Sequence, residues 1–228
     1  MRTAIVMAQH GQPQLTIACL QTLRRHHGDE PPVVLVDDGS PPGDLEQVLA
    51  AAIANLQIVR RPHRGVTAAW NAGAACCTAD VLIFLNNDVI TTGPWADRLA
   101  DLLVDRRIAV AGVERRRERH VSPEVLSRLP TGEFAAGWCF AVRRSDFEAI
   151  HSYRSALRLY FSDTDLQSRL LVRGGTGGEG IAAVPLPLKH LGHATTSACT
   201  TRHAQWQADR RRFQRLWKRG GSKRQACR

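Results

Sequence analysis

Short apolar runs alternate with amphipathic segments through the first half of the chain. The apolar runs, which predict buried strands, are residues 5–8, 33–36, 56–59 and 81–85. Helical spacing of apolar positions marks the segments between them, which are residues 15–25, 45–54 and 67–77. This repeated alternation is the pattern of a mostly parallel sheet with helices on both faces, so an α/β fold is expected.

The pattern is less regular beyond Pro94. Further elements are predicted at about 94–104 (helix), 108–113 (strand), 134–142 (strand) and 144–150 (helix). Residues 174–180 hold five glycines in seven positions and are expected to be mobile, either as a plain long turn or as a lid over a site. Without a repeat or a linker, residues 1–200 are expected to form one domain.

Residues 201–228 form a basic C-terminal segment. From Arg202 onward the chain holds ten Lys or Arg and one acid, Asp209. Residues 204–219 suit an amphipathic helix with Trp206 on or near its apolar face. A helix of this kind either lies on an anionic membrane surface or packs on its own domain. We expect it to pack, with the tail after it disordered.

Charge is divided unevenly between the two halves of the sequence. Residues 1–110 carry nine Lys or Arg and eleven Asp or Glu, whereas residues 111–228 carry twenty-two and ten. A basic second half favours anionic partners, such as a membrane surface, lipid-linked phosphates or nucleic acid. A solvated basic helix would show the same composition.

The remaining composition is that of an ordinary globular protein, with 43% apolar and 23% charged residues. No apolar run reaches the roughly eighteen residues of a membrane span, and the N-terminal residues predict a strand rather than a signal peptide. The six cysteines contain no Cys-x-x-Cys pair, so neither a zinc knuckle nor a disulfide framework is indicated. A cytoplasmic location is expected, with the inner face of the membrane as the alternative.

Two acidic patches follow predicted strands. Asp37 and Asp38 come directly after the second strand, and Asp88 follows the fourth strand after two asparagines. Open α/β sheets bind ligands at the carboxyl ends of their strands. The first pair can accept hydrogen bonds from a nucleobase or a ribose, or can form an Asx-type turn. Asp88 can offer an oxygen ligand to Mg²⁺ or Mn²⁺ beside a diphosphate.

A third acidic patch, Asp163 and Asp165, begins a predicted helix. Either Ser162 or Asp163 can cap that helix. The alternative role is a general base that takes a proton from a hydroxyl group, and two carboxylates allow one residue for each task.

Basic side chains are further candidates for binding a metal ion or a phosphate group. His190 and His193 can ligate a metal or, when protonated, bind phosphate. Arg60, Arg61, His63 and Arg64 can neutralise a diphosphate or can be plain loop charges.

In their order along the chain, these motifs resemble the family-2 inverting glycosyltransferases of the GT-A fold. The motifs are Asp37-Asp38-Gly39-Ser40, Gly65-x5-Asn71-x-Gly73, Leu85-Asn86-Asn87-Asp88, Gly137-x-Cys139-Phe140, Asp163-x-Asp165-Leu166-x3-Leu170 and His190-x-Gly192-x2-Thr195. The resemblance covers about residues 4–196. It implies a GT-A-type Rossmann-like sandwich, in which residues 1–113 bind the nucleotide sugar and residues 114–200 bind the acceptor.

The resemblance also implies a role for each matching residue. With Arg64 added as a diphosphate partner, the donor-binding residues would be Asp37, Asp38, Arg64, Asn71, Asn86 and Asp88. Asp163 would be the catalytic base, and the acceptor would contact Gly137, Trp138 and Asp165. Asp88 and His190 would hold Mn²⁺ or Mg²⁺. The implied reaction moves a sugar from a nucleoside-diphosphate sugar to a glycan, lipid-linked or other hydroxyl acceptor with inversion.

Two positions depart from the family pattern. Asn86 replaces the first acid of the Asp-x-Asp element, which is a frequent variation. Ser162 replaces the Glu of the Glu-Asp pair, which leaves the base in place but removes a carboxylate that often contacts the acceptor. The identity of the acceptor is therefore not predicted.

Three other functions remain open at this point. A GT-A enzyme can glycosylate a hydroxylated base in nucleic acid, with the basic second half of the chain binding the phosphates. A non-catalytic module can bind nucleotide or glycan, although intact Asp88 and Asp163 argue against this. A nucleotidyltransferase ranks last, because residues 8–13 lack the Gly-rich basic loop of that class.

Overall fold

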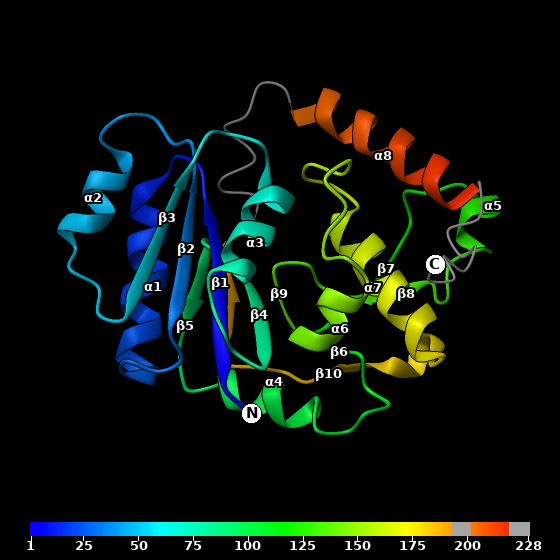
Figure 1. Cartoon of the computed structure of the whole chain (residues 1–228), viewed down its shortest axis with the longest axis horizontal. Coiled ribbons are helices and arrows are strands. Elements are labelled where there is room, and N and C mark those ends of the chain that lie inside the picture. The colour runs from blue at the N-terminus through cyan, green and yellow to red at the C-terminus, as the bar shows by residue number, and fades with distance from the viewer. Residues whose placement is uncertain (193–201, 219–228) are drawn as a thin grey trace.

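The computed structural model describes residues 1–192 and 202–218. Its centre is a seven-stranded sheet with the strand order β10-β6-β9-β4-β1-β2-β3 (Figure 1). These strands are β1 (Thr3–Gln9), β2 (Val33–Asp38), β3 (Leu56–Arg61), β4 (Val81–Asn86), β6 (Val110–Gly112), β9 (Cys139–Arg143) and β10 (Ile181–Ala183). The first four pair in parallel, and β9 runs antiparallel to both β4 and β6. The predicted α/β fold with a mostly parallel sheet is confirmed.

Helices cover both faces of the sheet. They are α1 (Pro13–His27), α2 (Asp44–Ala50), α3 (Val66–Ala75), α4 (Ala96–Leu102), α5 (Pro123–Leu126), α6 (Arg144–Ala149), α7 (Ser162–Gly174) and α8 (Arg202–Lys218). Successive strand residues enter different cores, as the two-residue period of a strand requires. In β1, Ile5 packs in the core that contains α1 and α4, and Val6 packs in the core that contains α3 and α7.

Two small ribbons extend the sheet edge where the site lies. One pairs β5 (Val89–Thr91) with β11 (Leu188–His190), and the other pairs β7 (Arg115–Arg117) with β8 (Glu133–Ala135). The sequence predicts one strand over 134–142, but the structure has two, β8 and β9, separated by a turn that contains Gly137.

The glycine-rich segment does not lie over the acidic residues of α7. It contains the C-terminal end of α7 and a 3₁₀ helix (Gly177–Gly180), whereas Asp163 lies in the first turn of α7. A helix of thirteen residues is about 20 Å long. The segment is therefore a turn at the far end of α7, and the lid interpretation is wrong.

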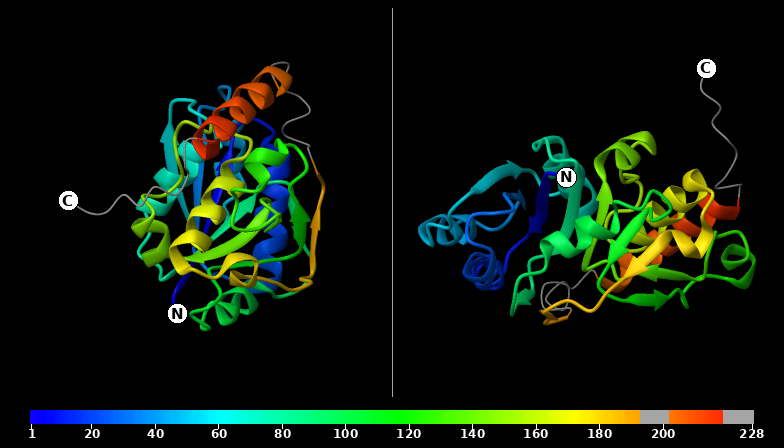
Figure 2. Two further views of the ribbon diagram at one scale, coloured as in Figure 1. Left: turned by 90° about the vertical axis from the view of Figure 1, so that its right-hand side faces the viewer. Right: turned by 90° about the horizontal axis from the view of Figure 1, so that it is seen from below.

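The basic helix α8 packs on the domain, as expected (Figure 2). Its residues Phe213 and Trp217 are fully buried. Asp209 is 0% exposed, and its carboxylate accepts hydrogen bonds from the backbone N–H groups of residues 158, 159 and 160 at 3.0–3.3 Å. The apolar face of α8 is thus covered by the domain, and α8 fixes the loop that leads into α7.

Two further predictions concern membrane spans and the C-terminal tail. Among the described helices, none is long and apolar enough to cross a bilayer. The tail for which disorder is predicted, residues 220–228, lies outside the described residues.

Candidate functional site

The candidate residues gather at one edge of the sheet because of its topology. The parallel strands β2 and β4 both end at this edge. The antiparallel strand β9 begins there, since Cys139 lies opposite Leu85. The backbone N–H of Asn86 consequently donates to the carbonyl of Trp138, at 2.9 Å. The strand-end acids and the Gly137 turn therefore share one region, as the sequence predicts.

Asp37 and Asp38 have different surroundings, although they are adjacent. The Asp38 carboxylate accepts hydrogen bonds from the backbone N–H groups of Arg64 and Gly65 at 2.7–3.2 Å and lies 3.0 Å from His63 Nδ1. Asp38 thus anchors the loop before α3. The Asp37 carboxylate accepts one hydrogen bond from Gln9 Nε2 at 3.2 Å, which leaves lone pairs for a ligand.

Asn71 and Arg64 make contacts at α3 and in the loop before it. The side chain of Asn71 bonds both backbone groups of Tyr153, at 2.9 and 3.0 Å. Its amide therefore ties α3 to a distant segment, which differs from the nucleoside contact that the resemblance implies. The Arg64 side chain is exposed at this edge, and its carbonyl accepts a hydrogen bond from Arg158.

Asp88 and His190 are brought together by the β5–β11 ribbon. His190 Nε2 lies 3.1 Å from Asp88 Oδ1, and the backbone N–H of Leu191 donates to the Asp88 carbonyl at 2.9 Å. Trp138 stacks on the His190 ring with centroids 4.9 Å apart, and its indole N–H donates to Glu114. Asp88 is 4% exposed. A carboxylate oxygen and an imidazole nitrogen thus lie within hydrogen-bonding distance of each other.

No third ligand of the usual kind joins this pair, since the described residues contain no group of three His, Cys, Asp or Glu side chains suited to a metal ion. Asn86, two residues before Asp88, is half-buried. The other candidate histidine, His193, lies outside the described residues. Trp138, predicted to contact the acceptor, lies against His190 instead.

Asp163 lies in the first turn of α7 but does not cap it. Phe161 precedes the helix in the left-handed conformation, and no side chain caps the N-terminus. The hydroxyl of Ser162 donates to the Leu159 carbonyl. Neither Ser162 nor Asp163 is therefore the N-cap residue, and that prediction is wrong. The Asp163 carboxylate is hydrogen-bonded to the backbone N–H of Thr164 in the same turn. Burial raises the pKa of Asp163, and the nearby Glu118 carboxylate adds to this rise.

Asp165 faces the interior, two residues along the same helix. It is 0% exposed, and it bonds Arg154 at 2.8 Å, Arg169 at 2.8 Å and the indole N–H of Trp217 at 3.1 Å. Its carboxylate is enclosed by these donors. The structure thus places Asp165 in a buried ion network that joins α7 to α8, rather than in the acceptor-binding position that the sequence predicts.

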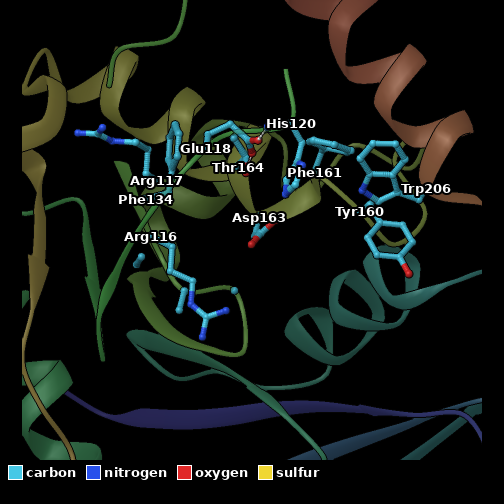
Figure 3. A pocket seen from close by; sticks show the side chains of 13 residues that line it. Arg116, Arg117, Glu118, His120, Phe134, Tyr160, Phe161, Asp163, Thr164 and Trp206 are labelled. Atoms are coloured by element: carbon cyan, nitrogen blue, oxygen red, sulfur yellow. Dashed lines mark hydrogen bonds between the residues drawn. The ribbon is translucent and has the colours of Figure 1, made fainter. Parts of the chain in front are cut away.

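A pocket of about 180 Å³ opens beside Asp163 (Figure 3). Its walls come from β7 and the following loop, from β8 and Gly137, from the start of α7 and from α8. Of its lining residues, only Gly137 and Asp163 belong to the predicted site, and Glu118 and Trp206 are among those that do not. No local signal identifies them, because both reach the pocket through contacts between segments far apart in the sequence.

Gly137 lies against Asp163, which gives a testable prediction. A Cβ atom at Gly137 would collide with Asp163 Oδ2 and lie 2.8 Å from its Cγ. Gly137→Ala should therefore displace the carboxylate and lower the activity of the site by about tenfold to a hundredfold, while ligands that contact only Asp37 and Asp88 still bind.

The matched control is Gly132→Ala, where the nearest atom to the added Cβ is 3.9 Å away. Turnover and ligand binding would be measured for both variants. An unchanged rate in a folded Gly137→Ala protein would show that the position of Asp163 is not critical.

Comparisons with known proteins agree with this architecture. The model of glycosyl transferase family 2 matches residues 4–165. Over 121 residues, the chain is 30% identical to the pre-mycofactocin glycosyltransferase of Mycobacterium tuberculosis, covering 53% of this chain and 22% of that protein. The match thus spans about a fifth of the curated relative's length.

Solved structures share the fold. The mannosyltransferase PcManGT from Pyrobaculum calidifontis, in complex with GDP-Man and Mn²⁺, has a TM-score of 0.65 at 18% identity and covers 90% of this chain and 61% of that one. GalNAc-T7 with UDP, GalNAc and Mn²⁺ has a TM-score of 0.58 at 16% identity, with coverages of 75% and 40%. The predicted GT-A-type fold is confirmed.

Proposed function

This chain belongs to glycosyl transferase family 2, and we propose that it moves a sugar from a nucleoside-diphosphate sugar to an acceptor hydroxyl in one displacement, with inversion at the sugar carbon. One observation carries the proposal. Asp37, the Asp88–His190 pair and Asp163 come from distant parts of the sequence, and all lie at the same edge of the sheet. That edge is where open α/β sheets bind ligands.

The donor nucleoside is assigned to Asp37. Its carboxylate has free lone pairs, and Gln9 holds it in position. Asp38, Arg64 and Asn71 support this part of the site, because they fix the loop before α3 and the helix itself. The exposed Arg64 side chain is also suited to the charge of a diphosphate.

Asp88 and His190 fit a divalent ion, Mn²⁺ or Mg²⁺. Such an ion needs only one or two protein carboxylates when phosphate oxygens complete its coordination, and the pair supplies one carboxylate and one imidazole. Bound there, the ion would neutralise negative charge on the departing nucleoside diphosphate.

Asp163 acts as the general base. It takes the proton of the acceptor hydroxyl while the hydroxyl oxygen bonds to the anomeric carbon and the bond from that carbon to the diphosphate breaks. The proton remains on Asp163, and the nucleoside diphosphate leaves. Because burial raises its pKa, Asp163 is a stronger base than an ordinary aspartate, which favours this proton transfer.

The test is calorimetric titration of the purified chain with UDP, dTDP and GDP, each with Mn²⁺ and again with excess chelator. We expect one nucleotide to bind, and to bind much more weakly when the metal is removed. A folded protein that binds none of the three would contradict the proposed donor site.

A further inference from the structure

The pocket beside Asp163 is lined by both aromatic and charged side chains, with Trp206 and Tyr160 at one end and Phe134 near Glu118 at the other (Figure 3). Four aromatic rings line it, namely Phe134, Tyr160, Phe161 and Trp206, together with the carboxylates of Glu118 and Asp163 (Figure 3). Apolar ring faces with a few fixed polar groups are the usual lining of a small-molecule site. The volume of about 180 Å³ is below the roughly 300 Å³ at which sites for drug-sized ligands begin. The pocket therefore suits a single ring rather than a longer segment.

Trp206 is held in place by its protein neighbours. The His120 ring contacts its indole edge-on, with centroids 5.8 Å apart. The Arg210 guanidinium lies over the indole ring, 5.5 Å from its centroid, and the His203 ring is stacked parallel to it with centroids 6.3 Å apart. Arg210 in turn donates to the His120 carbonyl at 2.6 Å. Because these contacts fix the indole before a ligand arrives, little side-chain freedom remains to be lost on binding.

Glu118 is held in place by two hydrogen bonds. Its Oε1 accepts a hydrogen bond from the backbone N–H of His120 at 2.7 Å, and its Oε2 lies 3.3 Å from the Thr164 hydroxyl. Each carboxylate oxygen can accept two hydrogen bonds, so Glu118 keeps capacity for a ligand. Two carboxylates that only accept hydrogen bonds, Glu118 and Asp163, suit a ligand with several hydroxyl groups.

The charges around the pocket are balanced. Arg116 lies 2.7 Å from Glu114, and Arg117 lies 3.7 Å from Glu133. Each of these lining arginines therefore has an acidic partner, and the pocket does not concentrate the positive charge that a phosphorylated ligand would favour. A neutral polyol fits this lining better than a phosphate or a nucleic acid strand.

We propose that the acceptor is a sugar whose terminal ring packs on Trp206 while its hydroxyl groups bind Glu118 and Asp163. This inference rests on the proposed function, since it names the acceptor class for the base Asp163. Trp206 lies beyond residues 4–165, the part that the family model matches. The Trp206 side of the pocket is thus built by α8, the helix that also anchors the loop before α7 through Asp209.

Saturation-transfer difference NMR on the full chain, with Mg²⁺ and the nucleotide that binds, tests the proposal. The probes are the methyl glycosides of glucose, mannose, galactose and N-acetylglucosamine, together with octyl phosphate and 5-hydroxymethyl-2′-deoxycytidine. We expect at least one glycoside to show enhancement, strongest on its ring C–H protons. Trp206→Leu should weaken its binding by about tenfold, as loss of aromatic stacking does, and Trp206→Phe should retain most of it. Glu118→Gln should also weaken the glycoside.

The matched control is Gln207→Ala, an exposed position one residue along α8. It should bind the glycoside like the unmodified protein. Unchanged glycoside binding in Trp206→Leu would overturn the proposal. A signal from octyl phosphate alone, from the nucleoside alone, or from none of the probes would also overturn it. Nucleotide titration of the same samples distinguishes a failure of the proposed acceptor class from a failure of the proposed function. If nucleotide still binds but no glycoside does, only the proposed acceptor class is contradicted. If neither binds, the proposed function is contradicted.

Discussion

Replacing Asp163 by asparagine should lower sugar transfer by about 10²- to 10⁴-fold, the usual contribution of a general base. Asparagine has nearly the same shape but cannot take a proton from the acceptor hydroxyl. Nucleotide binding should not change, because Asp163 lies against Gly137 and lines the pocket between β7, β8 and α7, whereas the donor is assigned to Asp37 and Asp88. The measurements are initial rates of transfer to a glycoside that binds, and nucleotide titration of the same protein.

The same substitution should stabilise the protein at neutral pH. Burial raises the pKa of Asp163 in the folded state above its value in the unfolded chain. Between these two pKa values the folded state binds more protons, so stability falls as pH rises through this window. A neutral asparagine at this position would carry no such penalty. At pH values above this window, the melting temperature of Asp163→Asn should therefore exceed that of the unmodified protein. At pH values below the window, the two melting temperatures should be more alike.

The control is Asp101→Asn, which makes the same chemical change at an exposed position of α4. It should alter neither the rate nor the melting temperature. Near-normal transfer by Asp163→Asn would mean that another group is the base. In the unmodified protein, transfer should be lost at low pH as Asp163 is protonated. Its raised pKa places this loss at a higher pH than an ordinary aspartate would give.

The sequence predicts where the acidic patches lie better than it predicts which acid in each patch meets a ligand. Asp37 and Asp38 are adjacent at a strand end, so their side chains point to opposite sides, and Asp38 meets the loop before α3. Asp163 and Asp165 are two positions apart on a helix of 3.6 residues per turn, and therefore face nearly opposite directions. Which direction is the interior depends on Arg169 and Trp217, and the latter is on another helix.

The pocket beside Asp163 is less accessible to prediction from the sequence. Residues 114–120 are all Glu, Arg or His, a composition typical of an exposed loop, and the basic composition of α8 is typical of a solvated helix. Glu118 reaches the pocket because β7 pairs with β8 beside α7. Trp206 reaches it because Asp209 and Trp217 dock α8 on the domain. Both depend on pairings across long sequence separations, which local propensity and spacing do not encode.

Asp88→Ala should abolish the metal-dependent part of nucleotide binding and lower transfer by at least about a hundredfold. The substitution removes the carboxylate of the proposed metal pair and leaves His190 alone. The β5–β11 ribbon should survive, because Asp88 holds Leu191 through its backbone carbonyl rather than its side chain. The loss is therefore expected in binding and turnover, with little change in melting temperature.

Calorimetric titration with the nucleotide that binds, with Mn²⁺ and with chelator, measures the effect directly. In Asp88→Ala the two titrations should coincide, and both should match the chelator titration of the unmodified protein. Asp80→Ala is the control, since Asp80 is an exposed acid before the opposite end of β4, and it should keep the full metal dependence. If Asp88→Ala kept that dependence as well, the ion would have to be held by other groups, and the leaving-group charge could not be assigned to the Asp88–His190 pair.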